Sequence, residues 1–386
     1  MAGKIPKARQ AFYAVLAAAV IFGGAELVFR LRDFKFYYNF SADLLGMPLL
    51  DMSRFRRIAN QTVEFDRSVF WKFKPNQMLD AKGVYLKPVR INNYGFRGPD
   101  FQMEKRPGSY RIICLGDSVT FGWSAGEDET YPARLEKILQ EKYPGCKIQV
   151  LNLGVTGYTS FQGKELFFTF AQKLEPDLVI TSFGANDRYP ALLSDQEHYD
   201  LGWWQANRMD LILRHSQVYK LLKAGVIYLK RRGQGLSLNP QTYLSGLKRK
   251  VSEREYGANI KMIKDECGRI GCGLILLNDD FPGLAVDPAF DALKDIAGKY
   301  NAKFPADWQK WDSLKVNQAV SARLGLPLID LRRLFTESEA ESDNGLMVDQ
   351  GHPNKSGHEI IALSLQKTIA DQPGFKKFLE KCPSKN

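Results

Sequence analysis

Four short segments of the chain carry residue types that could together perform acyl transfer. They are Gly116-Asp117-Ser118, Asn152-Leu153-Gly154, Gly184-Ala185-Asn186-Asp187 and Asp349-Gln350-Gly351-His352. A serine hydroxyl becomes an effective nucleophile when a neighbouring base accepts its proton, and that base needs a third group to fix its tautomer. We therefore predict Ser118 as the nucleophile, His352 as the base and Asp349 as the residue that orients it.

The same segments offer hydrogen-bond donors for the negative charge that develops on the substrate oxygen. Backbone N–H groups and side-chain amides are suitable donors for such an oxyanion hole. We predict that the N–H groups of Ser118 and Gly154 and the side-chain amide of Asn186 form it. Asp117 and Asp187 adjoin two of these residues, and we interpret them as structural carboxylates that hold the loops.

The first three segments each follow an apolar run that is typical of a buried strand. The five runs of this kind cover residues 112–115, 148–151, 178–182, 273–277 and 327–331. Helical patterns lie between them, one beginning near Pro132 and one over residues 160–174. This alternation predicts a parallel sheet with helices on both faces, and it places the segments at the carboxyl ends of the strands.

Together these residues resemble the SGNH/GDSL hydrolase family, which is named for Ser, Gly, Asn and His in four such blocks. The resemblance covers roughly residues 111–358, from Gly-Asp-Ser-Val-Thr-Phe-Gly to Asp-x-x-His-Pro-Asn-x-x-Gly-His. It implies an α/β fold, a flavodoxin-like three-layer sandwich around a central parallel sheet. The rival α/β-hydrolase elbow, Gly-x-Ser-x-Gly, does not fit because Thr120 stands where its second glycine is needed.

The composition indicates a folded protein with one large domain and appendages. The chain has 386 residues, of which 44% are hydrophobic and 25% charged, and its net charge is +11. Solvated helix faces are the simplest explanation for the spread-out basic residues, and an acidic polysaccharide substrate is an open alternative. No nucleic-acid, nucleotide-binding or His-Glu-x-x-His motif is present, so we expect no nucleic-acid partner, no cofactor and no metal.

The five cysteines are odd in number and form no Cys-x-x-Cys motif. Cys114 lies within the first predicted strand and is expected in the core. Cys267 and Cys272 are close enough in sequence to form a disulfide, but packing without a bond is at least as good an interpretation.

Residues 11–29 form an apolar stretch that just reaches the thickness of a bilayer, about 30 Å. Basic residues flank it on both sides, so the charge pattern does not settle its orientation. A cleaved signal peptide, with Gly23 and Ala25 before the cut, is the alternative to a retained anchor. We favour a single-pass anchor over residues 1–30, with the catalytic domain outside the cytoplasm.

The rest of the chain divides into three predicted parts. Residues 31–108 are an aromatic-rich extension that should pack on the catalytic domain, with residues 90–98 as a structural clasp. Residues 109–374 form the catalytic domain, with an insertion at about 188–260, and residues 375–386 form a basic tail. The insertion contains Trp203-Trp204 and a basic amphipathic stretch from Val218 to Arg232. A lid, an interfacial helix and an extra packed helix are all open interpretations of it.

The predicted function is that of a serine esterase or O-acyltransferase that works through an acyl-serine intermediate. The family resemblance favours ester groups, O-acetyl above all, on a cell-surface carbohydrate, because anchored members are often associated with polysaccharide modification. The expected substrate is an ester-bearing carbohydrate or another small ester, which water would hydrolyse, and a membrane acyl-donor partner is an open alternative for transfer. The alternative is a non-catalytic binding or scaffold subunit of an envelope assembly, with the extension and the insertion as its partner surfaces.

Overall fold

A computed structural model describes residues 6–32, 62–79, 87–191, 194–200, 216–219, 221–222, 248–278, 281, 298, 312–339, 345–349 and 351–383. Its centre is a five-stranded sheet of β5 (Ser109–Gly116), β6 (Lys147–Gly154), β7 (Leu178–Ser182), β10 (Gly273–Asn278) and β11 (Leu328–Asp330). The strands lie in the order β6-β5-β7-β10-β11 and all neighbours are parallel. This is the flavodoxin-like order, so the predicted fold class is confirmed.

The strands are buried on both faces, and β5 shows why. Ile112 and Cys114 belong to one hydrophobic layer, whereas Ile113 and Leu115 belong to the other, and all four are fully buried. Successive side chains of a strand point to opposite faces. A strand with apolar layers on both sides therefore has a continuous apolar sequence rather than an alternating one.

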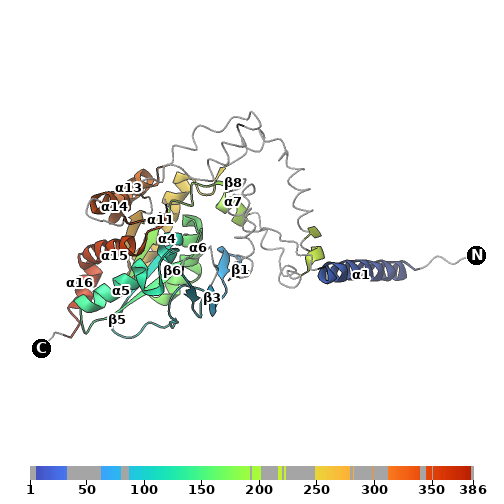
Figure 1. The fold of residues 1–386 in the computed structure, drawn as a ribbon, viewed down its shortest axis with the longest axis horizontal. Helices are drawn as coiled ribbons and strands as arrows, with labels where there is room; N and C mark the ends of the chain where they lie inside the picture. The colour runs from blue at the N-terminus through green and yellow to red at the C-terminus, as the bar shows by residue number, and fades with distance from the viewer. Residues whose placement is uncertain are drawn as a thin grey trace, which may run out of the picture.

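Helices cover both faces of the sheet (Figure 1). The layer that contains Ile112 also contains buried residues of α5 (Tyr131–Lys142), α14 (Leu331–Glu339), α15 (Lys355–Ala370) and α16 (Pro373–Leu379). The layer that contains Ile113 includes residues of α6 (Ser160–Thr169), α11 (Glu253–Ile270) and α13 (Ser313–Leu324). The helix predicted over residues 160–174 is α6 followed by a short 3₁₀ turn, Ala171–Leu174.

The amino-terminal extension forms two small antiparallel ribbons on the α6 side. They are β1 (Val63–Asp66) with β2 (Phe70–Phe73), and β3 (Gln77–Leu79) with β4 (Val89–Ile91). Phe70 is buried and its ring stacks on Phe161 of α6 at a centroid distance of 5.7 Å. The predicted aromatic residues Phe34, Phe36, Tyr37 and Tyr38 lie outside the described residues.

One amino-terminal helix, α1 (Lys7–Leu31), is long and apolar enough over residues 12–31 to cross a membrane, and that span is not buried in the protein. A signal sequence has the same character. Glu26, the acidic residue near its end, pairs with Arg30 at 3.1 Å. It also accepts hydrogen bonds from Ser216 Oγ (2.9 Å) and the Val218 N–H (3.1 Å), so the helix contacts the insertion. Trp203-Trp204 and most of the amphipathic stretch lie outside the described residues.

The carboxyl-terminal segment differs from the predicted basic tail. Phe375 of α16 is fully buried, and its ring packs against Tyr110 at 5.0 Å between centroids. A disulfide joins Cys382, just beyond this helix, to Cys146 at the start of β6, whereas Cys267 and Cys272 are free thiols. The helix was not predicted because basic residues dominate its sequence. Its apolar face consists of only a few aromatic rings, which pack against the distant strand β5.

Candidate active site

The nucleophile segment is a tight turn from β5 into the short helix α4 (Ser118–Phe121). Asp117 caps this helix by accepting a hydrogen bond from the Val119 N–H at 2.9 Å. Gly116 is required by close packing, since a Cβ there would lie 1.9 Å from Thr120 Oγ1 and 2.9 Å from Ser182 O. The turn places the half-buried Ser118 at the carboxyl edge of the sheet.

The base segment is a small closed loop that leads into α15. Its ends are tied by the bonds from the Val348 N–H to His352 O and from the Asn354 N–H to Leu346 O, both 2.9 Å. The Asn354 side chain then caps α15. Gly357 follows because a Cβ there would lie 2.4 Å from Leu346 O. The spacing of the His-Pro-Asn-x-x-Gly block is thus explained by the loop geometry.

The structure brings the three predicted triad residues into one hydrogen-bonded chain. His352 Nε2 lies 3.0 Å from Ser118 Oγ, and His352 Nδ1 lies 2.9 and 2.8 Å from the two carboxylate oxygens of Asp349. With Nδ1–H donating to Asp349, Nε2 is free to accept the Ser118 proton. This is the geometry that a nucleophile and its general base need.

The Asp349 carboxylate remains ionised at neutral pH. Burial raises its pKa, but the hydrogen bonds from the His352 ring and from the N–H groups of Gly351 and His352 outweigh burial and lower the pKa below its usual value. An ionised Asp349 stabilises the imidazolium that forms when His352 takes a proton. Its side chain is nevertheless 53% exposed, and that of His352 is 25% exposed.

An aromatic residue, Trp123, and a cationic residue, Arg97, hold the loop that follows Ser118. The Trp123 ring stacks on the His352 ring at 6.0 Å between centroids, and the backbone N–H of Trp123 donates to Ser118 O at 3.1 Å. The buried guanidinium of Arg97 donates to the carbonyls of Phe121 and Ala125 at 3.1 and 2.6 Å. Arg97 therefore acts as the structural clasp that was predicted for residues 90–98.

One of the predicted oxyanion donors, the Gly154 N–H, is already hydrogen-bonded within the protein. The Gly154 N–H donates to Asn152 Oδ1 at 2.9 Å, so it is not available to a substrate. Gly154 is still inside β6, and a Cβ there would lie 2.3 Å from Phe121 N. Close packing against α4, and not hydrogen bonding to substrate, explains this glycine.

The turn after β6 offers a better donor, Gly157. The Tyr158 N–H closes this turn on Val155 O at 3.2 Å, and Gly157 takes the left-handed φ of 81° that favours glycine. Among the described residues, neither the Gly157 N–H nor the Ser118 N–H has a hydrogen-bond acceptor. The signal in the sequence was a second glycine three residues after Gly154, in the position of a turn.

Asn186 is hydrogen-bonded to the chain neighbours of Ser118 and Gly157, which are Asp117 and Tyr158. Its amide donates to Asp117 Oδ2 at 2.7 Å and to Tyr158 O at 3.1 Å, so it joins the nucleophile segment to the glycine turn. Both amide hydrogens thus have acceptors within the protein. An oxyanion would have to share one of them, whereas the sequence predicted an amide that points only at the substrate.

The other two described histidines, His198 and His358, are not bonded to the triad. His358 is fully buried in α15, where Nδ1 accepts from the Tyr131 N–H of α5 at 3.3 Å. Burial, with a smaller contribution from Arg97, lowers the pKa of His358 to about 3. His198 packs its ring edge-on to Phe70 at 6.4 Å, and His215 lies outside the described residues.

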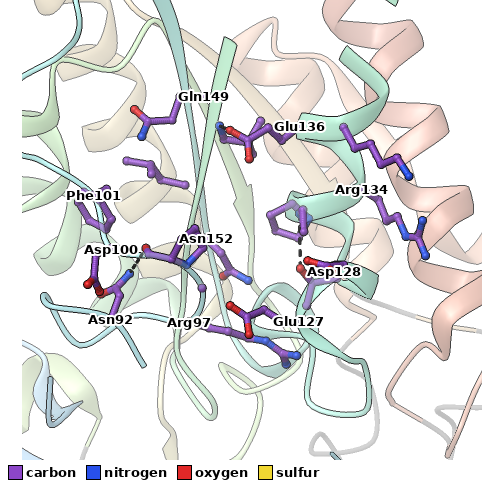
Figure 2. Close-up of a pocket in the computed structure, with 18 of the residues that line it drawn as sticks. Asn92, Arg97, Asp100, Phe101, Glu127, Asp128, Arg134, Glu136, Gln149 and Asn152 are labelled. Carbon is purple, nitrogen blue, oxygen red and sulfur yellow. Dashed lines mark hydrogen bonds between the residues drawn. The ribbon is translucent and has the colours of Figure 1, made fainter. Parts of the chain in front are cut away.

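A cavity of about 450 Å³ lies beside the edge strand β6 rather than at the triad (Figure 2). Its wall includes Asn152 and Glu136, but none of the predicted catalytic or oxyanion residues. The Glu136 carboxylate accepts from the Val150 N–H at 3.2 Å, and the Gln140 amide donates to Ile148 O at 3.0 Å. These α5 side chains occupy the open edge of the sheet, which protects it from pairing with another chain.

The chain is similar to a known protein family and to solved structures. The model of the GDSL-like Lipase/Acylhydrolase family matches residues 114–360. Among solved structures, a lipase/acylhydrolase from Enterococcus faecalis is 17% identical, with 72% of this chain and 99% of that chain covered and a TM-score of 0.39. A catalytic variant of an acetylxylan esterase from Geobacillus stearothermophilus is 18% identical, with 69% and 98% covered and a TM-score of 0.39. No curated protein matches the chain.

Proposed function

The chain belongs to the GDSL-like lipase/acylhydrolase family, and we propose that it is a membrane-anchored serine esterase that acts on O-acyl groups of a cell-surface carbohydrate. The observation that carries the proposal is the hydrogen-bonded chain from Ser118 through His352 to Asp349. An ester carbonyl is the substrate group that such a chain attacks.

The proposed reaction has two halves. Ser118 Oγ attacks the ester carbon while its proton passes to His352 Nε2, and the N–H groups of Ser118 and Gly157 stabilise the oxyanion together with Asn186. His352 then returns the proton to the alcohol oxygen as the carbon–oxygen bond breaks, which leaves the acyl group on Ser118. Water repeats the sequence and releases the acid. A sugar hydroxyl in place of water would make the enzyme an O-acyltransferase.

The surroundings of the triad support a carbohydrate ester. The reaction centre is half-exposed, and the Trp123 ring lies beside His352, where it could pack against a sugar ring. An aromatic ring gives a large contact area at low cost in conformational entropy. The net charge of +11 would also favour an acidic polysaccharide.

The disulfide supports a location outside the cytoplasm. Bonds such as Cys146–Cys382 form and persist in oxidising compartments, and α1 provides a candidate anchor. A carboxyl-terminal alkaline phosphatase fusion should therefore be active, while a fluorescent-protein fusion exported by the same route should be dark. The reverse pattern would place the enzyme in the cytoplasm and redirect the search toward lipids or small esters.

The enzymatic function is tested with the full-length protein in detergent. It should hydrolyse p-nitrophenyl acetate and react at Ser118 with a fluorophosphonate probe, and Ser118→Ala should abolish both. Replacing the nucleophilic serine of a serine protease lowers kcat by roughly 10⁶-fold. Failure of folded wild-type protein to react with the probe would favour the scaffold alternative. Release of acetate from an acetylated polysaccharide, compared with transfer to added sugar, then distinguishes hydrolase from transferase.

A further inference from the structure

A short ladder connects the two ends of the insertion next to the oxyanion side of the site. Strands β8 (Pro190–Ala191) and β9 (Lys248–Arg249) pair antiparallel. The ladder continues with the Lys250 N–H donating to Tyr189 O at 2.9 Å and the Val251 N–H donating to Asp187 O at 3.0 Å. The insertion therefore leaves and re-enters the domain one residue away from Asn186.

The insertion also contributes a buried carboxylate, Asp195, that contacts the catalytic domain. Asp195 begins the short helix α7 (Asp195–Asp200), and the residue is only 2% exposed. Its Oδ2 accepts a hydrogen bond from Thr159 Oγ1 at 2.5 Å, and its N–H donates to Lys250 O at 2.7 Å. Thr159 is two residues beyond Gly157 and caps α6.

The residue after Thr159 is held by a second carboxylate. Ser160 donates its N–H to Asp187 at 3.1 Å and also its hydroxyl to the same carboxylate. Asn259 of α11 donates to the Ser160 hydroxyl at 3.1 Å. Two consecutive residues that end the glycine turn are thus fixed by Asp195 from the insertion and by Asp187 from the β7 loop.

Lys250, which is 1% exposed, is a buried cation that is attracted electrostatically to both Asp195 and Asp187. Burial lowers the pKa of Lys250 to about 8 and raises that of Asp195 to about 6, while the attraction between the two groups opposes both shifts. Buried charges are costly unless they are paired in a fixed geometry. The network therefore holds the turn, the β7 loop and the insertion ends in one arrangement.

We propose that Asp195 is a positioning residue for catalysis, which through Thr159 fixes the glycine turn. That turn directs the Gly157 N–H to the oxyanion and offers the Tyr158 carbonyl to the Asn186 amide. The insertion is then a working part of the oxyanion hole and not an appendage. This inference rests on the proposed esterase function. It requires that a small shift of the turn reduce the stabilisation of the transition state without reducing the affinity for the substrate.

The test compares three variants of the full-length enzyme with p-nitrophenyl acetate as substrate. Asp195→Ala removes the acceptor for Thr159 and should lower kcat by roughly 10²-fold, the effect of a misplacement of about 1 Å, with KM changed by no more than about threefold. Asp195→Asn keeps an oxygen acceptor and should retain more of kcat. Glu197→Gln is the matched control, because Glu197 lies on the same helix as Asp195 but forms an exposed ion pair with Lys248 of β9.

Folding and chemistry are separated by a second pair of variants. Thr159→Ser keeps the hydroxyl and should retain wild-type kcat, whereas Thr159→Val should reproduce the loss seen in Asp195→Ala. All rates are divided by the fraction of folded protein, measured by circular dichroism at the assay temperature. An Asp195→Ala enzyme with wild-type kcat per folded molecule, or one whose loss lies wholly in KM, would overturn the inference.

The two proposals fail in different ways. If the wild type neither cleaves esters nor reacts with the fluorophosphonate probe, the esterase function itself is wrong. If the wild type is active and the Asp195 variants are equally active per folded molecule, only the positioning role is lost.

Discussion

The two sides of the active site are built by different means. On the base side, Asp349 and His352 are three residues apart, half-exposed and one-quarter exposed respectively, and tied together by bonds within one short loop. On the oxyanion side, the proposed donors lie next to buried groups from segments far apart in the chain, such as Thr159, Asp195 and Lys250. The orientation of the base is thus arranged by local sequence, whereas the proposed charge stabilisation is arranged by long-range packing.

This difference predicts how each side responds to substitution. A base-side change removes a chemical group but leaves the fold intact, because few other residues depend on it. An oxyanion-side change alters both the chemistry and the packing, since leaving a buried polar partner unsatisfied costs about 1–3 kcal/mol. Comparing kcat with the melting temperature therefore separates the two sides.

The largest effect is expected on the base side. Asp349→Ala should lower kcat by up to about 10⁴-fold, the loss seen when the orienting carboxylate of a serine protease is replaced. The melting temperature should be nearly unchanged because the side chain is half-exposed. Asp371→Ala, which removes an exposed aspartate near α16, is the control and should leave both quantities alone. Early melting of Asp349→Ala would show that the two sides are not built differently.

A smaller effect on kcat, accompanied by a loss of stability, is expected for Asn186→Ala. Removing one preorganised oxyanion donor lowers kcat by about 10²–10³-fold, and here the bonds to Asp117 and Tyr158 are lost as well. The control is Asn317→Ala, a buried asparagine of α13 that donates to Ser313 O and accepts from Tyr256. That variant should melt early yet keep its kcat. If Asn186→Ala behaves in the same way, Ser118 and Gly157 must hold the oxyanion alone.

The smallest effect concerns acid stability and the second histidine of the base-side motif. His358 has a pKa of about 3 in the folded protein, whereas an unfolded histidine titrates near 6.5. The unfolded state therefore binds more protons between these values, and the free energy of unfolding falls by at most about 1.4 kcal/mol per pH unit below 6.5. His358→Gln should be less stable at pH 7 but should lose less of its stability between pH 7 and pH 5. Parallel melting curves for wild type and variant over this range would contradict the assignment.

The strands of the sheet and the contact between Asp349 and His352 were predictable from local sequence. Apolar runs such as residues 112–115 and 178–182 identify buried strands because their length and composition are local properties. The Asp349-x-x-His352 spacing likewise gives a hydrogen bond within one loop. Ser118 lies in a turn at the end of a strand. Once the fold class is known, its position at the same edge of the sheet as His352 follows.

Which N–H groups are free to bind an oxyanion, and what holds the carboxyl-terminal helix, depend on the tertiary structure. Gly154 and Gly157 are both plausible donors in the sequence, and the choice depends on the Asn152 side chain and on the approach of α4. The Cys146–Cys382 bond and the buried Thr159–Asp195 contact likewise join residues 236 and 36 positions apart. Such pairings leave no periodic signal, because they follow from how the helices and loops pack and not from any local preference.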